Sequence, residues 1–161
     1  MRAFVRAPGE LEQLLGVRAA QDWLQFPEII EYSIEQLTTK PEIASWWMYF
    51  FVLPQDNALI GNGGFKGAAD ADGTVEIGYA VAPAYQGRNL ATEAAQNLVD
   101  WAFSHSHITN VTAHTLAETN ASTKVLTKIG MRKVAEKFDP DDGEVWQWRI
   151  AREDYERRQQ G

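Results

Sequence analysis

The strongest constraint on the fold is a change of periodicity between residues 74 and 103. Residues 74–82, TVEIGYAVA, form a strand pattern that Pro83 stops. A polar turn follows at 84–89, AYQGRN. Over residues 90–102 the apolar side chains then recur on one side of a helix and the polar ones on the other. The sequence therefore predicts a strand, a tight turn and a helix that lies on a sheet.

The other elements follow from the same signals. They are expected as a short strand at 2–6, helices opening at Pro8 and over 26–37, strands at 46–53 and 58–65, a strand at 109–115, a helix at 120–129, and a closing hairpin of strands at 131–138 and 145–150. Segment 46–53, WWMYFFVL, is apolar throughout and predicts a central strand covered on both faces. Gly61, Gly63 and Gly64 indicate a bulge or a close approach of two backbones.

Length and composition narrow the function classes. The 161 residues are expected to form a single domain over 1–151, followed by a polar C-terminal tail at 152–161. The chain has no cysteine, which excludes disulfides, thiolate metal sites and a cysteine nucleophile. A net charge of -7 argues against a nucleic-acid partner and slightly favours a cationic substrate. No apolar stretch suits a signal peptide or a membrane span, so we expect a cytoplasmic location and no membrane partner.

The turn before residue 90 has the properties of an anion site. The first backbone N–H groups of a helix have no intrahelical partner, and the helix dipole places partial positive charge there. Gly87 permits close backbone approach, and Arg88 can add a charge-assisted hydrogen bond. The P-loop and dinucleotide-binding patterns are both absent. A strand-to-helix turn with no ligand explains the same residues equally well. The turn alone does not distinguish this interpretation from anion binding.

The wider sequence shows a family resemblance. The run EIGYAVAPAYQGRNLATEAAQNLVDWAF, followed some thirty residues later by NASTKVLTKIGM, resembles the GNAT superfamily of acetyl-CoA-dependent N-acetyltransferases, most of all the branch that includes the ribosomal-protein N-terminal acetyltransferases. The resemblance is strongest over about residues 75–138. It implies an α/β (α+β) fold, in which a mixed, mainly antiparallel central sheet of six to seven strands is flanked by about four helices.

The resemblance also implies a set of coenzyme contacts. Backbone amides of the family's Gln/Arg-x-x-Gly-x-Gly/Ala turn hold the coenzyme A pyrophosphate, and the matching positions here are Gln86, Gly87, Arg88, Asn89, Leu90 and Ala91. Asn89 departs from the pattern, which has glycine there, although asparagine adopts the left-handed region more readily than other non-glycine residues. The pantetheine arm would pair with the backbone of Tyr79, Ala80 and Val81.

A second turn, before the helix at 120–129, matches the family less closely. The family pattern here is Asn-x-x-Ser. Thr119 occupies the asparagine position, Asn120 follows one residue later, and Ser122 occupies the serine position. Either Thr119 or Asn120 is expected to cap the helix, with coenzyme contact as the functional hypothesis. Leu126 replaces the family's frequent tyrosine acid, so solvent or another group would have to protonate the leaving thiolate.

Direct acetyl transfer needs a neutral amine and a stabilised oxyanion. Glu76 is the candidate base because it lies on the strand of the pantetheine arm, and His114 is the runner-up; water is the alternative proton carrier. His105 and His107 do not suggest a metal site. The aromatic residues are expected to pack in the core, and some could line an acceptor pocket. Asn62 and Lys66 are assigned no function.

Three functions remain open at this stage. The first is an N-acetyltransferase that moves the acetyl group of acetyl-CoA, its cosubstrate, to a primary amine of a small molecule or a protein N-terminus. The second is a non-catalytic acyl-CoA sensor or interaction module of the same fold, and the third is a phosphate-ligand protein unrelated to coenzyme A. The edge strands of the closing hairpin offer a route to a homodimer.

Overall fold

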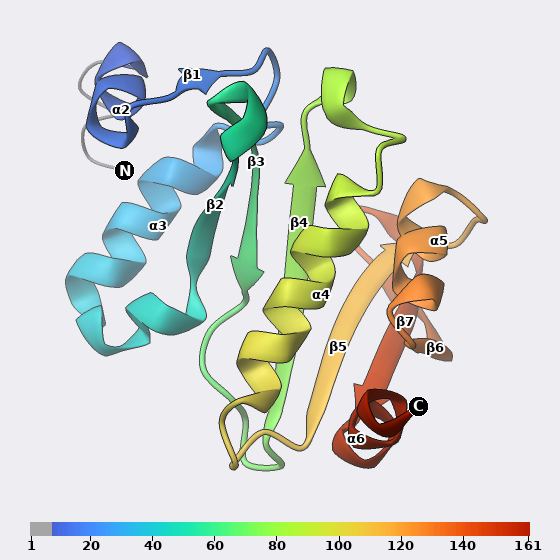
Figure 1. Ribbon diagram of the computed structural model, residues 1–161. Coiled ribbons are helices and arrows are strands. Elements are labelled where there is room, and N and C mark those ends of the chain that lie inside the picture. The colour runs from blue at the N-terminus through green and yellow to red at the C-terminus, as the bar shows by residue number, and fades with distance from the viewer. Residues whose placement is uncertain (1–7) are drawn as a thin grey trace. The chain divides into compact units, whose positions relative to one another are not determined.

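The computed structural model describes residues 8–161, and Figure 1 traces them from the N-terminal elements in blue to the C-terminal ones in red. The first half contains α2 (Pro8–Leu15), β1 (Arg18–Ala19), α3 (Glu28–Thr39), the 3-10 helix η1 (Pro41–Trp46), β2 (Met48–Leu53), η2 (Pro54–Asp56), β3 (Ala58–Phe65) and β4 (Thr74–Val81). The second half contains η3 (Pro83–Tyr85), α4 (Leu90–Phe103), β5 (Asn110–Leu116), α5 (Ala121–Lys128), β6 (Arg132–Asp139), β7 (Gly143–Ala151) and α6 (Arg152–Gln160). The strand expected at 2–6 lies outside the described residues.

Seven strands form one mixed sheet. Its hydrogen-bonded order is β1-β3-β4-β5-β7-β6, and β2 also pairs with β3. The pairs β2/β3, β5/β7 and β6/β7 are antiparallel, whereas β1/β3 and β4/β5 are parallel. The expected α/β fold with a mainly antiparallel sheet is therefore confirmed. The two-residue strand β1 was missed, since two residues carry no readable alternation.

Contacts along the chain divide it into two compact units. The first unit takes the described residues up to Gly64 together with Tyr79–Leu90, and the second takes Phe65–Gly78 together with Ala91–Gly161. Strand β4 contributes to both, because the division falls after Gly78. Each unit has its own buried side chains.

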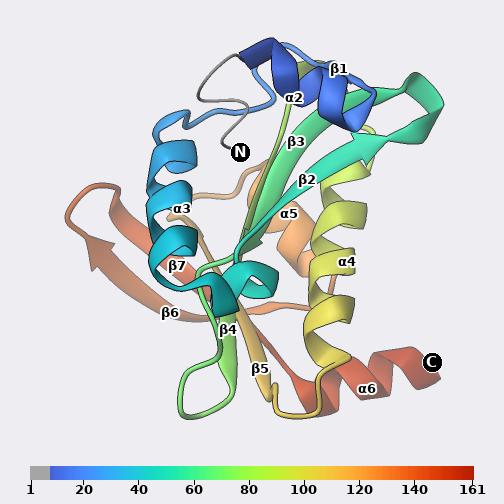
Figure 2. The same cartoon turned by 90° about the vertical axis from the view of Figure 1, so that its left-hand side faces the viewer.

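The core of the first unit joins α2 to the sheet. Leu11, Trp23, Leu59 and Ala82 are buried together, and half-buried apolar residues pack around them. The close backbone approach expected from the glycines is confirmed, because a side chain on Gly61 would collide with the carbonyl oxygen of Ala80. The β2/β3 ladder also contains a bulge, where its register shifts between Phe51 and Val52. Figure 2 shows β2 and β3 running side by side.

The expectation of a central, doubly covered strand at 46–53 was wrong. The strand begins at Met48, after the 3-10 turn η1, and its first four residues are half-buried rather than buried. Its partner within residues 8–161 is β3. The apolar sequence reflects aromatic packing instead of burial: Phe50 meets Trp23 edge to face, with ring centroids 5.8 Å apart. Large aromatic rings can cover a surface and still remain partly exposed.

The second unit is built around α4 and the strands β5 and β7. Helix α4 buries one side, as its periodicity predicts: Ala95, Leu98, Val99, Ala102 and Phe103. Strand β7 pairs with β5 along seven residues and with β6 on its other edge, so the closing hairpin is confirmed. No helix among residues 8–161 is long and apolar enough to cross a membrane.

Residues 152–160 form helix α6, although their sequence suggests only a polar tail. The Arg152 guanidinium donates hydrogen bonds to the carbonyl oxygens of Phe103, His105 and Ile108, at 2.7 to 3.2 Å. The ring of Tyr155 stacks on Phe103 with centroids 4.6 Å apart. A charged residue that binds backbone carbonyls leaves no apolar signature, which explains why composition does not reveal this helix.

Candidate active site

The turn between η3 and α4 adopts a special backbone conformation. Gly87 and Asn89 both have positive φ angles, 75° and 64°, and α4 begins at Leu90 immediately afterwards. Residues 86–89 are exposed. A side chain added at Gly87 would meet open space. Glycine is therefore favoured here by the positive φ angle and not by a lack of room. The expected left-handed conformation of Asn89 is confirmed.

Side chains on either side of this turn hold it in place. Gln86 Nε2 donates a hydrogen bond to the carbonyl oxygen of Val81, at 3.0 Å, which ties the turn to the end of β4. The Arg88 guanidinium lies over the Tyr85 ring, 5.1 Å from its centroid, and one of its nitrogens is 3.9 Å from the Asp56 carboxylate. The turn thus brings an exposed guanidinium to the start of α4, where an anion would be stabilised.

In the second unit, the two candidate catalytic residues lie in contact. Glu76 Oε1 is 3.0 Å from His114 Nδ1, and the other carboxylate oxygen, Oε2, pairs with Lys66 Nζ. The side chains of Glu76 and His114 are 23% and 25% exposed, so both are sheltered but reachable. Sequence reasoning gave Lys66 no role. It meets Glu76 because the backbone N–H of Lys66 donates to the carbonyl oxygen of Glu76, at 2.9 Å, a pairing with no local sequence signal.

A further carboxylate, Asp139, is under the electrostatic influence of this cluster. Hydrogen bonds from the backbone N–H groups of Asp142 and Asp141 hold the pKa of Asp139 below its ordinary value, and the charges of Lys66 and His114 act in the same direction. Asp139 therefore carries its negative charge at neutral pH.

The ladder between β4 and β5 is short. It runs from the pair Thr74/Asn110 to the pair Glu76/Thr112, although β4 continues to Val81 and β5 to Leu116. Glu76 therefore stands at the point where this pairing ends. Strand backbone beyond such a point can accept an extended ligand as an additional strand.

The N-terminus of α5 is closed by its own side chains. Asn120 is the N-cap: its Oδ1 accepts from the backbone N–H of Thr123, at 3.0 Å, and Thr123 Oγ1 accepts in return from the Asn120 N–H, at 2.9 Å. Thr119 is exposed and Ser122 is half-buried. Leu126, at the tyrosine position of the family, is fully buried.

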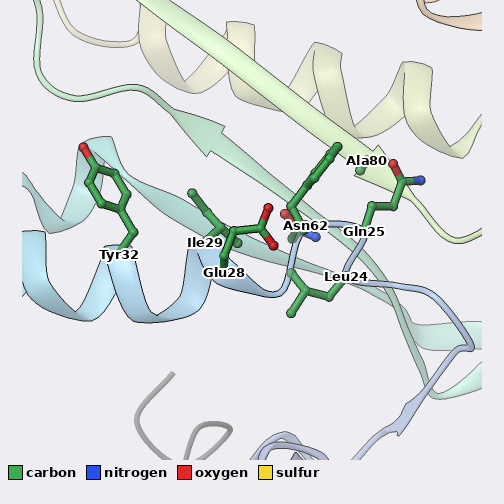
Figure 3. A pocket seen from close by; sticks show the side chains of 8 residues that line it. Leu24, Gln25, Glu28, Ile29, Tyr32, Asn62 and Ala80 are labelled. Atoms are coloured by element: carbon green, nitrogen blue, oxygen red, sulfur yellow. The ribbon is translucent and has the colours of Figure 1, made fainter. Parts of the chain in front are cut away.

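A pocket of about 410 Å³ opens in the first unit, as Figure 3 shows. Leu24, Gln25, Phe26, Glu28, Ile29, Tyr32, Asn62 and Ala80 line it. The Glu28 carboxylate points toward the part of the pocket where Asn62 lies, and Tyr32 occupies the opposite part (Figure 3). Asn62 Nδ2 donates to the Trp23 carbonyl oxygen, at 3.1 Å. Sequence reasoning did not find this pocket, whose residues come from three separate segments of the chain.

The described residues contain no group of three His, Asp or Glu side chains arranged to hold a metal ion. The site residues fall into two sets. Tyr79–Val81, the turn at 86–89 and the pocket belong to the first unit, whereas Glu76, His114 and the start of α5 belong to the second.

Comparison with known proteins gives a consistent result. Residues 4–132 match the acetyltransferase (GNAT) domain. The chain is 30% identical over 118 residues to the uncharacterized N-acetyltransferase YjdG of Bacillus subtilis, and the match covers 72% of this chain and 70% of that protein.

Solved structures agree in fold. The aminoglycoside acetyltransferase AAC(6')-Ib, in complex with coenzyme A, superposes with a TM-score of 0.68 at 18% identity and covers 93% of this chain and 94% of its own. The ribosomal-protein-S5-alanine acetyltransferase from Vibrio fischeri gives a TM-score of 0.67 at 17% identity and covers 86% of this chain and 79% of its own. The family match spans the strand, the turn and the helix that carry the candidate site. This chain belongs to the GNAT family and is an acyltransferase.

Proposed function

We propose that this protein transfers the acetyl group of acetyl-CoA directly to a primary amine, on a small molecule or a protein N-terminus. The observation that carries the proposal is the exposed turn before α4, in which Gly87 and Asn89 both have left-handed backbone conformations. Such a turn at a helix N-terminus presents backbone N–H groups to an anion. The coenzyme A bound to AAC(6')-Ib, a protein of the same fold, supports acetyl-CoA as the cosubstrate.

The proposed coenzyme site has three parts. The turn residues Gln86, Gly87, Arg88, Asn89, Leu90 and Ala91 would hold the pyrophosphate. The backbone of Tyr79, Ala80 and Val81 would pair with the pantetheine arm, which the early end of the β4/β5 ladder favours. Thr119, Asn120 and Ser122 are proposed to contact the coenzyme through backbone groups, because the Asn120 side chain already caps α5.

Acetyl-CoA supplies the acetyl group as a thioester, whose sulfur leaves as a thiolate. The acceptor must lose one proton as its nitrogen forms the amide bond, and the thiolate gains one as the carbon–sulfur bond breaks. We propose that Glu76 and His114 accept the proton from the amine as a pair. Both oxygens of Glu76 are engaged, by His114 Nδ1 and by Lys66, so the accepting atom of the pair is His114 Nε2. This differs from the expectation that Glu76 itself is the base.

In this arrangement Glu76 orients the imidazole ring. A carboxylate that accepts from Nδ1–H fixes the tautomer whose Nε2 lone pair is available, and it stabilises the imidazolium that forms.

Acetyl-CoA consumption with a panel of amines tests the proposal. We expect turnover, and we expect Glu76→Gln and His114→Asn each to lower kcat/KM by about 100-fold below pH 8, as loss of a general base does. The loss should shrink at high pH, where more of the acceptor is already neutral in solution.

Glu144→Gln, which removes an exposed carboxylate of β7, is the matched control and should behave as the unmodified protein does. A pH–rate profile unaffected by Glu76→Gln would remove Glu76 from the mechanism. If His114→Asn alone were silent, the base would be Glu76 acting directly. Binding of coenzyme A without turnover of any amine would instead favour the acyl-CoA sensor, a function compatible with buried Leu126 in place of a tyrosine acid.

A further inference from the structure

The pocket of the first unit combines apolar walls with a single carboxylate. Five of its eight residues, Leu24, Phe26, Ile29, Tyr32 and Ala80, are apolar or aromatic. The remaining three are Gln25, Glu28 and Asn62, so the lining includes one carboxylate and no lysine, arginine or histidine. Its volume of about 410 Å³ lies in the range of small-molecule sites.

Glu28 is the charged member of the lining, and no cation of residues 8–161 pairs with it. It stands in the first turn of α3, and Figure 3 shows its carboxylate directed toward the Asn62 part of the pocket. Glu28 is exposed, so its carboxylate is open to a cationic ligand that enters the pocket.

The polar and aromatic neighbours of Glu28 suit the same kind of ligand. Asn62 uses one hydrogen of Nδ2 on the Trp23 carbonyl, and its oxygen Oδ1 can accept a hydrogen bond from a ligand. Phe26 and Tyr32 are 63% and 49% exposed, which leaves aromatic faces available to a cation or an apolar chain. Each of these features favours a ligand that donates hydrogen bonds and carries positive charge.

We infer that this pocket binds the acceptor, and that the acceptor is a small amine with an apolar body and a second positively charged group that pairs with Glu28. The inference rests on the proposed acetyl transfer. Ala80 lines the pocket and belongs to the segment proposed to hold the pantetheine arm, so the reacting nitrogen lies at the Ala80 end. In Figure 3, Glu28 lies between Ala80 and Tyr32, where it meets the second charge of an extended molecule. An acceptor with a carboxylate there is repelled.

Two acceptors of equal length measure the preference. Hexylamine and 1,6-diaminohexane differ in the second ammonium group, and we expect kcat/KM to be about tenfold higher for the diamine. Glu28→Gln should abolish this difference by raising KM for the diamine with little change for hexylamine. Glu31→Gln removes a carboxylate from the same helical turn but outside the pocket lining, and it should retain the preference.

A second readout does not depend on catalysis. The bis-quaternary ammonium compound hexamethonium cannot be acetylated, and its binding can be followed by thermal shift of the full chain. We expect it to stabilise the unmodified protein and Glu31→Gln, but not Glu28→Gln. If no amine is acetylated while hexamethonium binding still depends on Glu28, the proposed reaction fails and the cation site stands.

If amines are acetylated while Glu28→Gln leaves both the diamine preference and hexamethonium binding unchanged, the inference is overturned and acetyl transfer stands. Equal losses in Glu28→Gln and Glu31→Gln would also overturn it, because they would reflect general surface charge. Better turnover of a peptide with a free N-terminus than of either small amine would overturn the assignment to a small molecule.

Discussion

At position 89 the backbone has a φ of 64°, a conformation that glycine adopts freely and asparagine more readily than most L-residues. Asn89 can therefore stand in place of the glycine of the family pattern and keep the left-handed backbone conformation. Gly87, two residues earlier, has the same left-handed conformation with open space around it. The turn therefore depends on these two φ angles together with the side-chain contacts of Gln86 and Arg88.

Substitutions at Asn89 test whether this conformation serves the coenzyme. Asn89→Gly should preserve or tighten coenzyme A binding, because it removes a Cβ near the phosphates without changing the permitted φ. Asn89→Val should abolish detectable binding, since a β-branched residue is strained in the left-handed region and the turn must rearrange. Isothermal titration calorimetry with coenzyme A measures both effects.

Unfolding curves of the two variants provide the control, because the exposed turn should permit folding in both cases. Equal affinity of Asn89→Gly and Asn89→Val for coenzyme A would contradict the role of this turn. It would also remove the main support for the proposed pyrophosphate site.

Helix α6 shows how one element is attached through polar contacts. Tyr155 donates from its hydroxyl to Asp100 on α4, at 2.9 Å, while its ring stacks on Phe103. Burial raises the pKa of Tyr155 to about 12, and the hydrogen bond to Asp100 and the charge of Asp100 act in the same direction. The folded state thus favours the neutral phenol over the phenolate.

The pH dependence of this attachment can be predicted. An unfolded tyrosine has a pKa of about 10, so the raised folded pKa contributes stability that is complete below pH 10 and is lost as the pH rises through about 12. Tyr155→Phe keeps the ring stack and removes the hydroxyl. It should lower the free energy of unfolding by about 1 kcal/mol near neutral pH.

Urea unfolding of both proteins from pH 7 to pH 12 measures the effect. The difference between them should narrow above pH 10, because the tyrosine of the unfolded chain then ionises, which favours unfolding, while the folded phenol stays protonated until about pH 12. A difference that stays constant over this range would show that the hydroxyl contributes nothing through its hydrogen bond. The comparison uses the difference between two proteins because other tyrosines and lysines also ionise at these pH values.

For the whole molecule, binding of a cosubstrate should appear as added stability. A ligand that binds only the folded state at 100 times its Kd contributes about 2.7 kcal/mol. For a chain of this length that corresponds to a rise in Tm of roughly 5 to 10 °C. We expect this rise with acetyl-CoA, measured by differential scanning fluorimetry.

Adenosine triphosphate at the same concentration is the control, since it also carries an adenine and a phosphate chain. A larger shift with adenosine triphosphate than with acetyl-CoA would favour a general phosphate-ligand protein over an acetyltransferase. Loss of the acetyl-CoA shift in Asn89→Val would connect the stability of the molecule to the turn before α4.

Local sequence was enough for much of the fold and for part of the candidate site. Pro83, Gly87 and the periodicity of residues 90–102 predict the strand, turn and helix. Strand-ending and turn-forming residues, like amphipathic spacing, act between near neighbours in the sequence. The left-handed conformation of Asn89 and the helix cap near residue 120 belong to the same class, since each depends on a few adjacent residues.

Tertiary structure alone decided which distant residues meet. Lys66, Glu76 and His114 come from three segments, and their contacts depend on strand pairing and register, which single residues do not encode. The pocket around Glu28 and the docking of α6 through Arg152 arise in the same way. Backbone conformation is governed by short-range sterics that a sequence displays directly, whereas a site assembled across strands exists only after the chain has paid the entropy of bringing its segments together.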